Sequence, residues 1–188
     1  MKIMENKKNE FRIMRGNYPY EKKGLIDMID WINNITPTKE LTMLEIGSYI
    51  GESTCIFADH FKEVISIDPF INDYDPNDEA CSFASFDLVY EEFLKNILFR
   101  PNVKSIRNTS KNAFSFLKQY KWDIVYIDGS HALPDVWFDV ENYQKIIKPG
   151  GFISGHDYNW GNVRHSIGQL LNDEVDEVFV DASWIKRL

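Results

Sequence analysis

The chain has 188 residues, with 21 basic and 29 acidic side chains and a formal net charge of −8. This length is typical of one domain, and a hydrophobic content of 44% excludes an intrinsically disordered chain. The acidic balance argues against nonspecific nucleic-acid binding and against docking on an anionic membrane, because both depend on Lys and Arg. Composition therefore favours small-molecule chemistry.

The sequence contains no pattern typical of a targeting or membrane segment. Its first residues are charged, and no apolar stretch approaches the roughly 18 residues of a membrane span. The only two cysteines, Cys55 and Cys81, are too few for a disulfide scaffold. We therefore expect a reduced, cytoplasmic protein with no membrane partner.

Residues 1–40 form the first predicted region, a polar arm followed by an amphipathic helix. The apolar side chains that recur at helical spacing are Leu25, Ile26, Met28, Ile29 and Ile32. Such a stripe packs on the rest of the domain or on another subunit, so a homodimer is one expectation.

From residue 41 onward, short apolar runs alternate with longer amphipathic ones. The predicted strands cover residues 41–46, 64–67, 103–106, 122–127 and 152–154. The predicted helices cover residues 52–60, 86–99, about 113–117, 136–147 and 163–172. This alternation predicts an α/β fold, a doubly wound, mostly parallel sheet with helices on both faces.

Three connecting segments complete the pattern. Pro149-Gly-Gly predicts a turn, and residues 71–82 predict a solvated acidic flap. Residues 177–180 and 184–186 predict two strands joined by a tight turn, hence an antiparallel hairpin at one edge of the sheet.

In an open parallel sheet, ligands bind beyond the carboxyl ends of the strands. The first strand runs into Gly47 and Gly51, which allow a sharp turn before a helix N-terminus that can face a negative group. The second strand ends at Asp68, about 20 residues later, the position of the ribose-binding acid in nucleotide folds. Together the two loops predict a nucleotide-like ligand.

The fourth and fifth strands end in a second polar group. Asp128 and His131 follow one strand, and His156 and Asp157 follow the other. If these strands are neighbours, about 4.8 Å apart, the four side chains converge, and the carboxylates need a cation or a shared proton between them. The alternative is that Asp128 caps a turn and His156 is a core histidine, which explains each residue singly but not the whole set.

These motifs resemble class I S-adenosylmethionine-dependent methyltransferases. The resemblance rests on Leu44–Thr54, on Ile67-Asp68 and on the ordered motifs of residues 123–158, and it covers about residues 40–188. The chain is most similar to the small-molecule O-methyltransferases grouped with macrocin-type sugar methylases and cephalosporin-hydroxylase-like proteins. This group implies a Rossmann-like seven-stranded sheet of order 3-2-1-4-5-7-6, with the hairpin contributing the antiparallel strand.

The resemblance assigns residues 41–188 to a methyltransferase domain that binds S-adenosylmethionine. Asp68 would hold the ribose hydroxyls, and Phe70 with the segment 108–110 would flank the adenine. The implied cofactor-binding set is Glu45, Gly47, Ser48, Tyr49, Gly51, Ser53, Asp68, Pro69, Phe70, Thr109, Ser110 and Asp128.

The same resemblance implies a divalent metal that fixes and acidifies the acceptor hydroxyl. Its expected ligands are Asp128, His156 and Asp157, with His131 as the other imidazole that could complete the site, and an imidazole ligand leaves Mg²⁺ and softer divalent ions both open. The sequence departs from the family at Leu133-Pro134, where an aromatic residue is usual. His131 is then an alternative general base that needs no metal. The predicted catalytic set is Asp128, His131, His156 and Asp157.

Two other functions remain open from the residues alone. A nicotinamide-dependent Rossmann oxidoreductase is weakened by the absence of the tight Gly-x-Gly-x-x-Gly turn. A noncatalytic nucleotide-binding partner is weakened by the intact group of acids and histidines. We expect an S-adenosylmethionine-dependent O-methyltransferase that acts on a small hydroxylated molecule, a sugar or a secondary metabolite.

Overall fold

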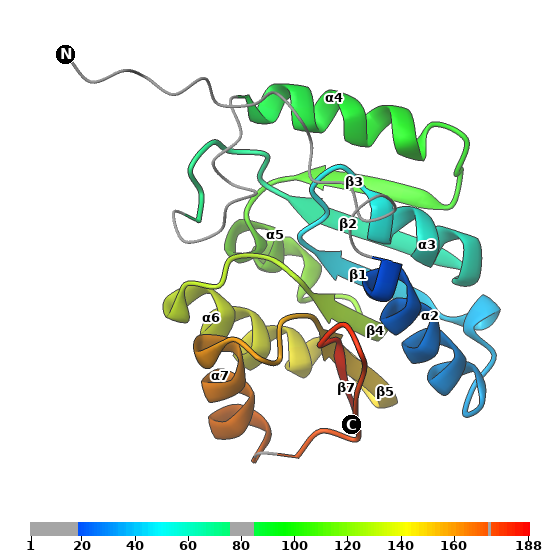
Figure 1. The fold of residues 1–188 in the computed structure, drawn as a ribbon, viewed down its shortest axis with the longest axis vertical. Helices are drawn as coiled ribbons and strands as arrows, with labels where there is room; N and C mark the ends of the chain where they lie inside the picture. Colours follow the sequence, from blue (N-terminus) through cyan, green and yellow to red (C-terminus); the bar gives the residue numbers. More distant parts are fainter. Residues whose placement is uncertain (1–18, 76–84, 173) are drawn as a thin grey trace.

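The computed structural model describes residues 19–75, 85–172 and 174–188. Seven strands form one sheet of order β3-β2-β1-β4-β5-β7-β6 (Figure 1). The strands are β1 (Thr42–Ile46), β2 (Glu63–Asp68), β3 (Val103–Arg107), β4 (Trp122–Ile127), β5 (Ile147–Gly155), β6 (Glu177–Val178) and β7 (Trp184–Arg187). The helices are α2 (Pro19–Asn33), α3 (Glu52–His60), α4 (Phe86–Ile97), α5 (Ser110–Leu117), α6 (Leu133–Tyr143) and α7 (Gly161–Leu171).

Strand directions confirm the predicted topology. The five strands β1 to β5 run parallel, whereas β7 pairs antiparallel with both β5 and β6. Strand β1 lies between β2 and β4, so the order of connection reverses there. A ligand cleft is expected at this reversal, because the loops after β1 and β4 lead to opposite sides of the sheet.

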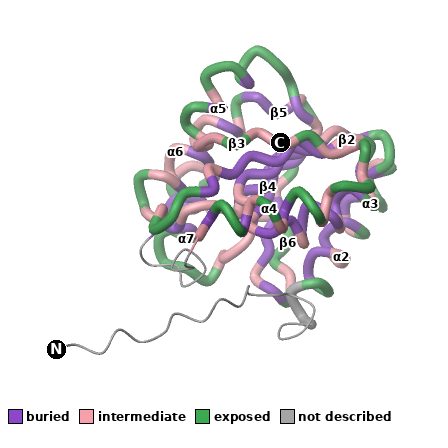
Figure 2. The backbone as a smooth tube through the Cα atoms, turned by 90° about the horizontal axis from the view of Figure 1, so that it is seen from above, coloured by how far each residue is buried: buried purple, intermediate pink, exposed green. Residues whose placement is uncertain are grey.

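Helices cover both faces of the sheet, and the strand side chains alternate between them (Figure 1). In β4, Ile124 and Tyr126 pack under α2 and α3, whereas Val125 and Ile127 pack under α5, α6 and α7. The centre of the fold is consequently buried, and exposed residues lie mainly at its periphery (Figure 2). A sheet covered on both faces explains why β4 is almost wholly apolar in sequence.

Helix α2 packs on the protein's own sheet. Leu25, Met28, Ile29 and Ile32 are at most 2% exposed and belong to the same cluster as Phe152 of β5. The apolar stripe is thus covered by the sheet of the same chain, and the predicted polar arm before the helix lies outside the described residues.

Two local predictions differ from the structure. The segment 149–151 is a bulge inside β5 rather than a turn before it, because Trp122 and Ile124 of β4 pair with Ile147 and Phe152 of β5. The glycines allow this irregularity, since Gly150 has a φ of +79°. Helix α6 begins three residues earlier than predicted, with Pro134 in its first turn, where a missing N–H costs nothing.

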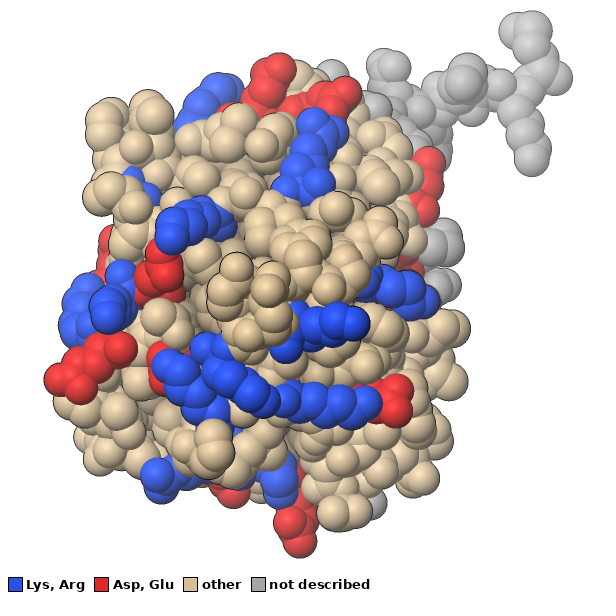
Figure 3. Space-filling view, turned by 180° about the vertical axis from the view of Figure 1, so that it is seen from behind, with Lys and Arg blue, Asp and Glu red and all other residues tan. Residues whose placement is uncertain are grey.

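The surface carries both signs of charge. Figure 3 shows Lys and Arg side chains spread over the rear face with Asp and Glu among them. The described ion pairs include Lys148 with Asp123 and Arg100 with Asp59, at 2.6 and 3.3 Å. None of the helices described is both long and apolar enough to cross a membrane.

Candidate active site

The carboxyl ends of β1, β2, β4 and β5 surround a cavity of about 350 Å³. This volume lies within the range of small-molecule sites, about 300–1,000 Å³. Eight of the predicted cofactor residues line it, namely Gly47, Ser48, Tyr49, Ser53, Asp68, Pro69, Ser110 and Asp128. All four predicted catalytic residues line it as well. The structure therefore brings both predicted groups to one cavity.

The loop after β1 needs its first glycine. Gly47 has a φ of +84°, and a Cβ placed there would lie 2.0 Å from the carbonyl oxygen of Asp128. Any larger residue would push the loop away from the end of β4. Tyr49 also has a positive φ of 47°, a strained conformation that is often found at binding sites. The close fit of the two loops forms the floor of the cavity.

Asp68 holds this loop through backbone N–H groups. Ser48 N and Tyr49 N donate to its Oδ2 at 2.9 and 3.0 Å, and Phe70 N donates to Oδ1 at 2.7 Å. Burial raises the pKa of the Asp68 carboxyl above its ordinary value, although these donors and Arg107 oppose the rise. A carboxylate has about four acceptor positions, so one remains for a ligand.

Glu45 occupies a different place from the one predicted. Its side chain is fully buried, where it accepts hydrogen bonds from Ser53 Oγ at 2.7 Å and Thr54 Oγ1 at 2.5 Å. Burial raises the pKa of this carboxyl to about 7. Glu45 thus anchors the start of α3 beneath the loop instead of lining the cavity. Gly51, Phe70 and Thr109 also lie outside the described lining.

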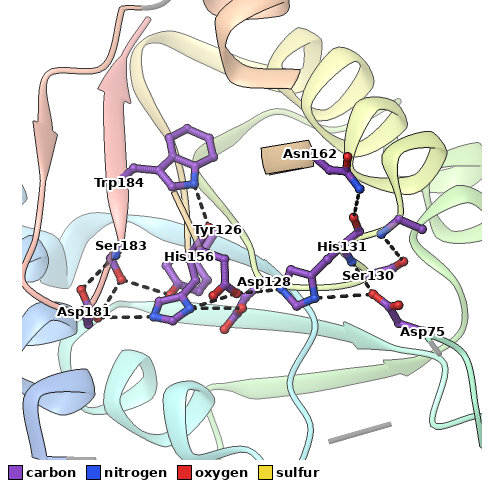
Figure 4. Close-up of polar contacts among 12 residues, drawn as sticks. Asp75, Tyr126, Asp128, Ser130, His131, His156, Asn162, Asp181, Ser183 and Trp184 are labelled. Carbon is purple, nitrogen blue, oxygen red and sulfur yellow. Dashed lines mark hydrogen bonds and ion pairs between the residues drawn. The ribbon is translucent and has the colours of Figure 1, made fainter. Parts of the chain in front are cut away.

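The residues after β4 and β5 form an alternating chain of carboxylates and imidazoles (Figure 4). At its centre, Asp157 Oδ2 lies 2.7 Å from His131 Nε2 and 3.1 Å from His156 Nδ1. Asp157 has a φ of +57°, so the backbone at this residue is in the left-handed region. That conformation places one carboxylate between two imidazoles from different strands.

Three further carboxylates extend this chain. His131 Nδ1 lies 3.5 Å from Asp75, which also accepts a 2.6 Å hydrogen bond from His131 N. On the other side, His156 lies 3.8 Å from Asp128 and 3.9 Å from Asp181. Both imidazoles are therefore flanked by acids.

The surrounding charges shift the two central groups in opposite directions. Burial alone lowers the pKa of His156, but Asp128, Asp157 and Asp181 together raise it to about 10. Burial alone raises the pKa of Asp157, but hydrogen bonds from His131 and His156 hold it far below its ordinary value. At neutral pH, an imidazolium at His156 therefore offsets part of the negative charge.

Several contacts fix the position of His131. Asn162 donates to its carbonyl oxygen at 2.9 Å, and Trp160 stacks on its ring with 4.4 Å between centroids. Its side chain is only about a tenth exposed. Held in this way, the imidazole presents its Nε2 to Asp157 in one orientation.

Asp128, His131 and Asp157 each offer a ligand atom, and these atoms all lie within 4.8 Å of one another. Two carboxylates and one imidazole are a suitable donor set for a divalent cation. The group contains both predicted carboxylates and His131, one of the two imidazoles expected to complete the site.

Three buried acids around the cavity were not predicted as site residues. Asp75 was assigned to a solvated flap but is only 1% exposed, whereas residues 76–82 of that flap lie outside the described residues. Asp181 is 5% exposed in the turn between β6 and β7, and Asp139 is 2% exposed on α6. Asp139 lies within the motif region of residues 123–158, whereas Asp75 and Asp181 lie outside it.

Comparison with known proteins supports a family assignment. The family described as "Methyltransferase domain" matches residues 44–158, more than half of the chain. A curated relative, the uncharacterized protein R132 of Acanthamoeba polyphaga mimivirus, is 25% identical over 156 residues. That alignment covers 78% of this chain and 66% of the relative, so the chain spans slightly less than two thirds of the relative's length.

Solved structures share the fold at low sequence identity. The TDP-rhamnose 3'-O-methyltransferase CalS11, an enzyme in calicheamicin biosynthesis, is 11% identical, with a TM-score of 0.62 over 93% of this chain and 85% of its own. The N-methyltransferase NodS from Bradyrhizobium japonicum is 14% identical, with a TM-score of 0.60 over 91% and 97%. The family match, the strand order and the position of the cavity at the strand ends all support the same family assignment. The protein is therefore a member of the methyltransferase domain family.

Proposed function

We propose that the protein transfers a methyl group from S-adenosylmethionine to a hydroxyl group of a small molecule, a sugar or a secondary metabolite. The observation that carries this proposal is the contact of His131 with Asp157 at 2.7 Å, on the wall of the cavity that Asp68 also lines. An acid–base pair and a nucleotide-type loop thus share one space. The same arrangement supports placement among the macrocin-type O-methyltransferases.

The cofactor is proposed to lie across the ends of β1 and β2. Asp68 has an acceptor position left for the ribose hydroxyls, and the Gly47 turn lets the ligand approach the backbone closely. Asp128 borders both this region and the acid–base group. When bound, S-adenosylmethionine supplies an electrophilic methyl group on a sulfonium.

The acceptor hydroxyl must lose its proton at or before the attack. The His131–Asp157 pair is suited to receive that proton, because the Asp157 carboxylate, 2.7 Å from Nε2, stabilises the imidazolium that forms when His131 takes the proton up. Asp75 accepts from the backbone N–H of His131 and Asn162 donates to its carbonyl oxygen, so both hold the backbone that carries the imidazole. Asp128, His131 and Asp157 would also hold a divalent cation, which would lower the pKa of a hydroxyl bound to it.

The charge of the cavity limits the class of acceptor. Eight acidic residues line it, namely Glu52, Asp68, Asp75, Asp128, Asp135, Asp139, Asp157 and Asp181, and no Lys or Arg does within the described chain. An anionic group would be repelled at close range by this lining. We therefore propose an acceptor that is neutral or carries an amine, rather than a phosphate, a carboxylate or a coenzyme A ester.

Calorimetric titration with S-adenosylhomocysteine and with NAD tests the cofactor assignment. We expect binding of the first and no measurable heat from the second, and the reverse result would favour the oxidoreductase. Transfer of label from S-adenosyl[methyl-³H]methionine to neutral, amine-bearing and carboxylate-bearing polyols then tests the acceptor class. Methylation confined to the carboxylate-bearing set would contradict the proposal.

A further inference from the structure

Asp139 is a buried acid that the proposed methyl transfer does not use. It lies in the second turn of α6, is 2% exposed, and borders the cavity. The Ser110 side chain hydrogen-bonds its carboxyl group, but its Oδ1 has no hydrogen-bond partner within the described part of the structure. Burial raises the pKa of this carboxyl to about 7. A buried acceptor left unpaired is costly, and a ligand that supplies a donor removes the cost.

The position of Asp139 is well defined. Tyr143, one turn later on the same face of α6, donates from its hydroxyl to the carbonyl oxygen of Ser110 at 2.7 Å. Helix α6 thus contacts the first residue of α5 at two points. Because α5 packs against β2 and α6 against β4, this corner of the cavity lies where these two helices meet, on the face of the sheet that they cover.

A cofactor placed as proposed has few donors that can reach this corner. Its amino group and its ribose hydroxyls belong near Asp128 and Asp68, respectively, and the acceptor belongs near His131. The remaining donor is the exocyclic amine of adenine, at the end of the molecule farthest from the sulfonium. Ser110 already lines this corner, which agrees with the predicted adenine segment.

We propose that Oδ1 of Asp139 accepts a hydrogen bond from the exocyclic amine of the cofactor's adenine, so that Asp139 selects adenine over other bases. This inference rests on the proposed function. It adds a specificity residue from α6, a helix that sequence motifs for nucleotide binding do not include. A carboxyl in this position also disfavours a base with a carbonyl at the same ring carbon, because two acceptors would then face each other.

A double-mutant cycle on ligand and protein tests the inference. The ligands are S-adenosylhomocysteine and its 6-deamino analogue, in which hydrogen replaces the amine. We expect the wild-type protein to bind the analogue at least tenfold more weakly, and D139A to bind the two ligands within about twofold of each other. D139N keeps the size of the side chain and an acceptor oxygen, so its ratio of the two dissociation constants should lie between those of the wild type and D139A. This variant also serves as a control for a folding defect in D139A.

Asp135 provides a matched control, because it lies one turn earlier on α6, lines the same cavity and already accepts from Ser130 Oγ at 3.0 Å. The ratio of the dissociation constants of the two ligands should therefore be the same in D135A as in the wild type. If D139A still binds S-adenosylhomocysteine and the ratio of the two dissociation constants equals that of the wild type, the Asp139 inference alone is overturned. Failure of the wild type to bind S-adenosylhomocysteine would overturn the proposed function and this inference with it.

Discussion

The two ends of the cavity hold their carboxylates by different means. At the cofactor end, Asp68 accepts from three backbone N–H groups of residues within about 20 positions in sequence. At the reaction end, Asp157 is held by two imidazoles, and Asp75 and Asp181 approach those imidazoles from distant loops. One end is a loop stabilised by its own backbone, and the other is a network of ionisable side chains.

Because of this difference, we expect cofactor affinity and turnover to depend on different residues. Backbone donors do not titrate, so the cofactor end keeps its donors at any pH in the working range. The imidazoles and carboxylates of the reaction end shift each other's pKa, so a change at one member alters the others. Substitutions at the reaction end should therefore change turnover with little effect on cofactor affinity, whereas substitutions at Asp68 should do the opposite.

The largest effect is expected from Asp157→Asn. The amide cannot hold a charge between His131 and His156, so kcat should fall by about 10²–10⁴. Affinity for S-adenosylhomocysteine should stay within about tenfold, or 1.4 kcal/mol. Asp128→Asn should behave in the same way. Steady-state kinetics and calorimetry measure the two quantities, with exposed Asp59→Asn as a control. A parallel loss of cofactor binding would show that the two ends are not separable.

Removal of divalent ions distinguishes the two routes to the alkoxide. We expect EDTA to abolish turnover and excess Mg²⁺ or Mn²⁺ to restore it, because Asp128, His131 and Asp157 form a suitable ligand group. Activity that survives EDTA but is lost in His131→Ala would instead make His131 the general base without a metal. Radiolabel transfer after dialysis against the chelator measures the outcome.

At the cofactor end, Asp68→Ala should weaken binding of S-adenosylhomocysteine by about 1.5–3 kcal/mol, the value of hydrogen bonds to a charged group. The loss has two sources, the ribose contact and the loop that Ser48 and Tyr49 tie to Asp68. Calorimetry measures the affinity, and kcat at saturating cofactor should change much less. Unchanged affinity would contradict the proposed position of the cofactor.

The smallest effect concerns stability beneath the cofactor loop. Glu45 has a folded pKa of about 7 against an ordinary 4.5, so the folded protein binds its proton more tightly than the unfolded chain does. The stabilisation from protonated Glu45 is fully present below pH 4.5 and is lost as the pH rises through 7. Urea unfolding at pH 5 and pH 8 should thus show a loss of stability that is larger in the wild type than in Glu45→Gln by on the order of 2 kcal/mol. The remaining loss in the variant comes from Asp139 and His156, whose pKa values are also raised. An equal loss in both proteins would assign the effect to another group.

Much of the fold follows from local patterns along the chain. The alternation of apolar runs and amphipathic helices predicts the parallel sheet, and the placement of Asp68, Asp128 and Asp157 at strand ends predicts the edge where they meet. The strand order came from the resemblance to methyltransferases, and the pairing confirms it. The bulge at 149–151 was missed, because the same Pro-Gly-Gly signal is typical of both a turn and an irregular strand.

By itself, the sequence determined the fold class and the meeting of the Asp and His residues after β4 and β5, because hydrophobic periodicity and strand ends are local properties. Only the tertiary structure shows that Glu45 points into the core and that His131, Asp128 and Asp157 each bring a possible ligand atom to one place. The same is true of Asp75 and Asp181. Asp75 lies 56 residues before His131, the histidine that it faces, and Asp181 faces His156 from the turn between β6 and β7. Such contacts depend on side-chain direction and on packing between distant segments, and neither is encoded in the spacing of residues along the chain.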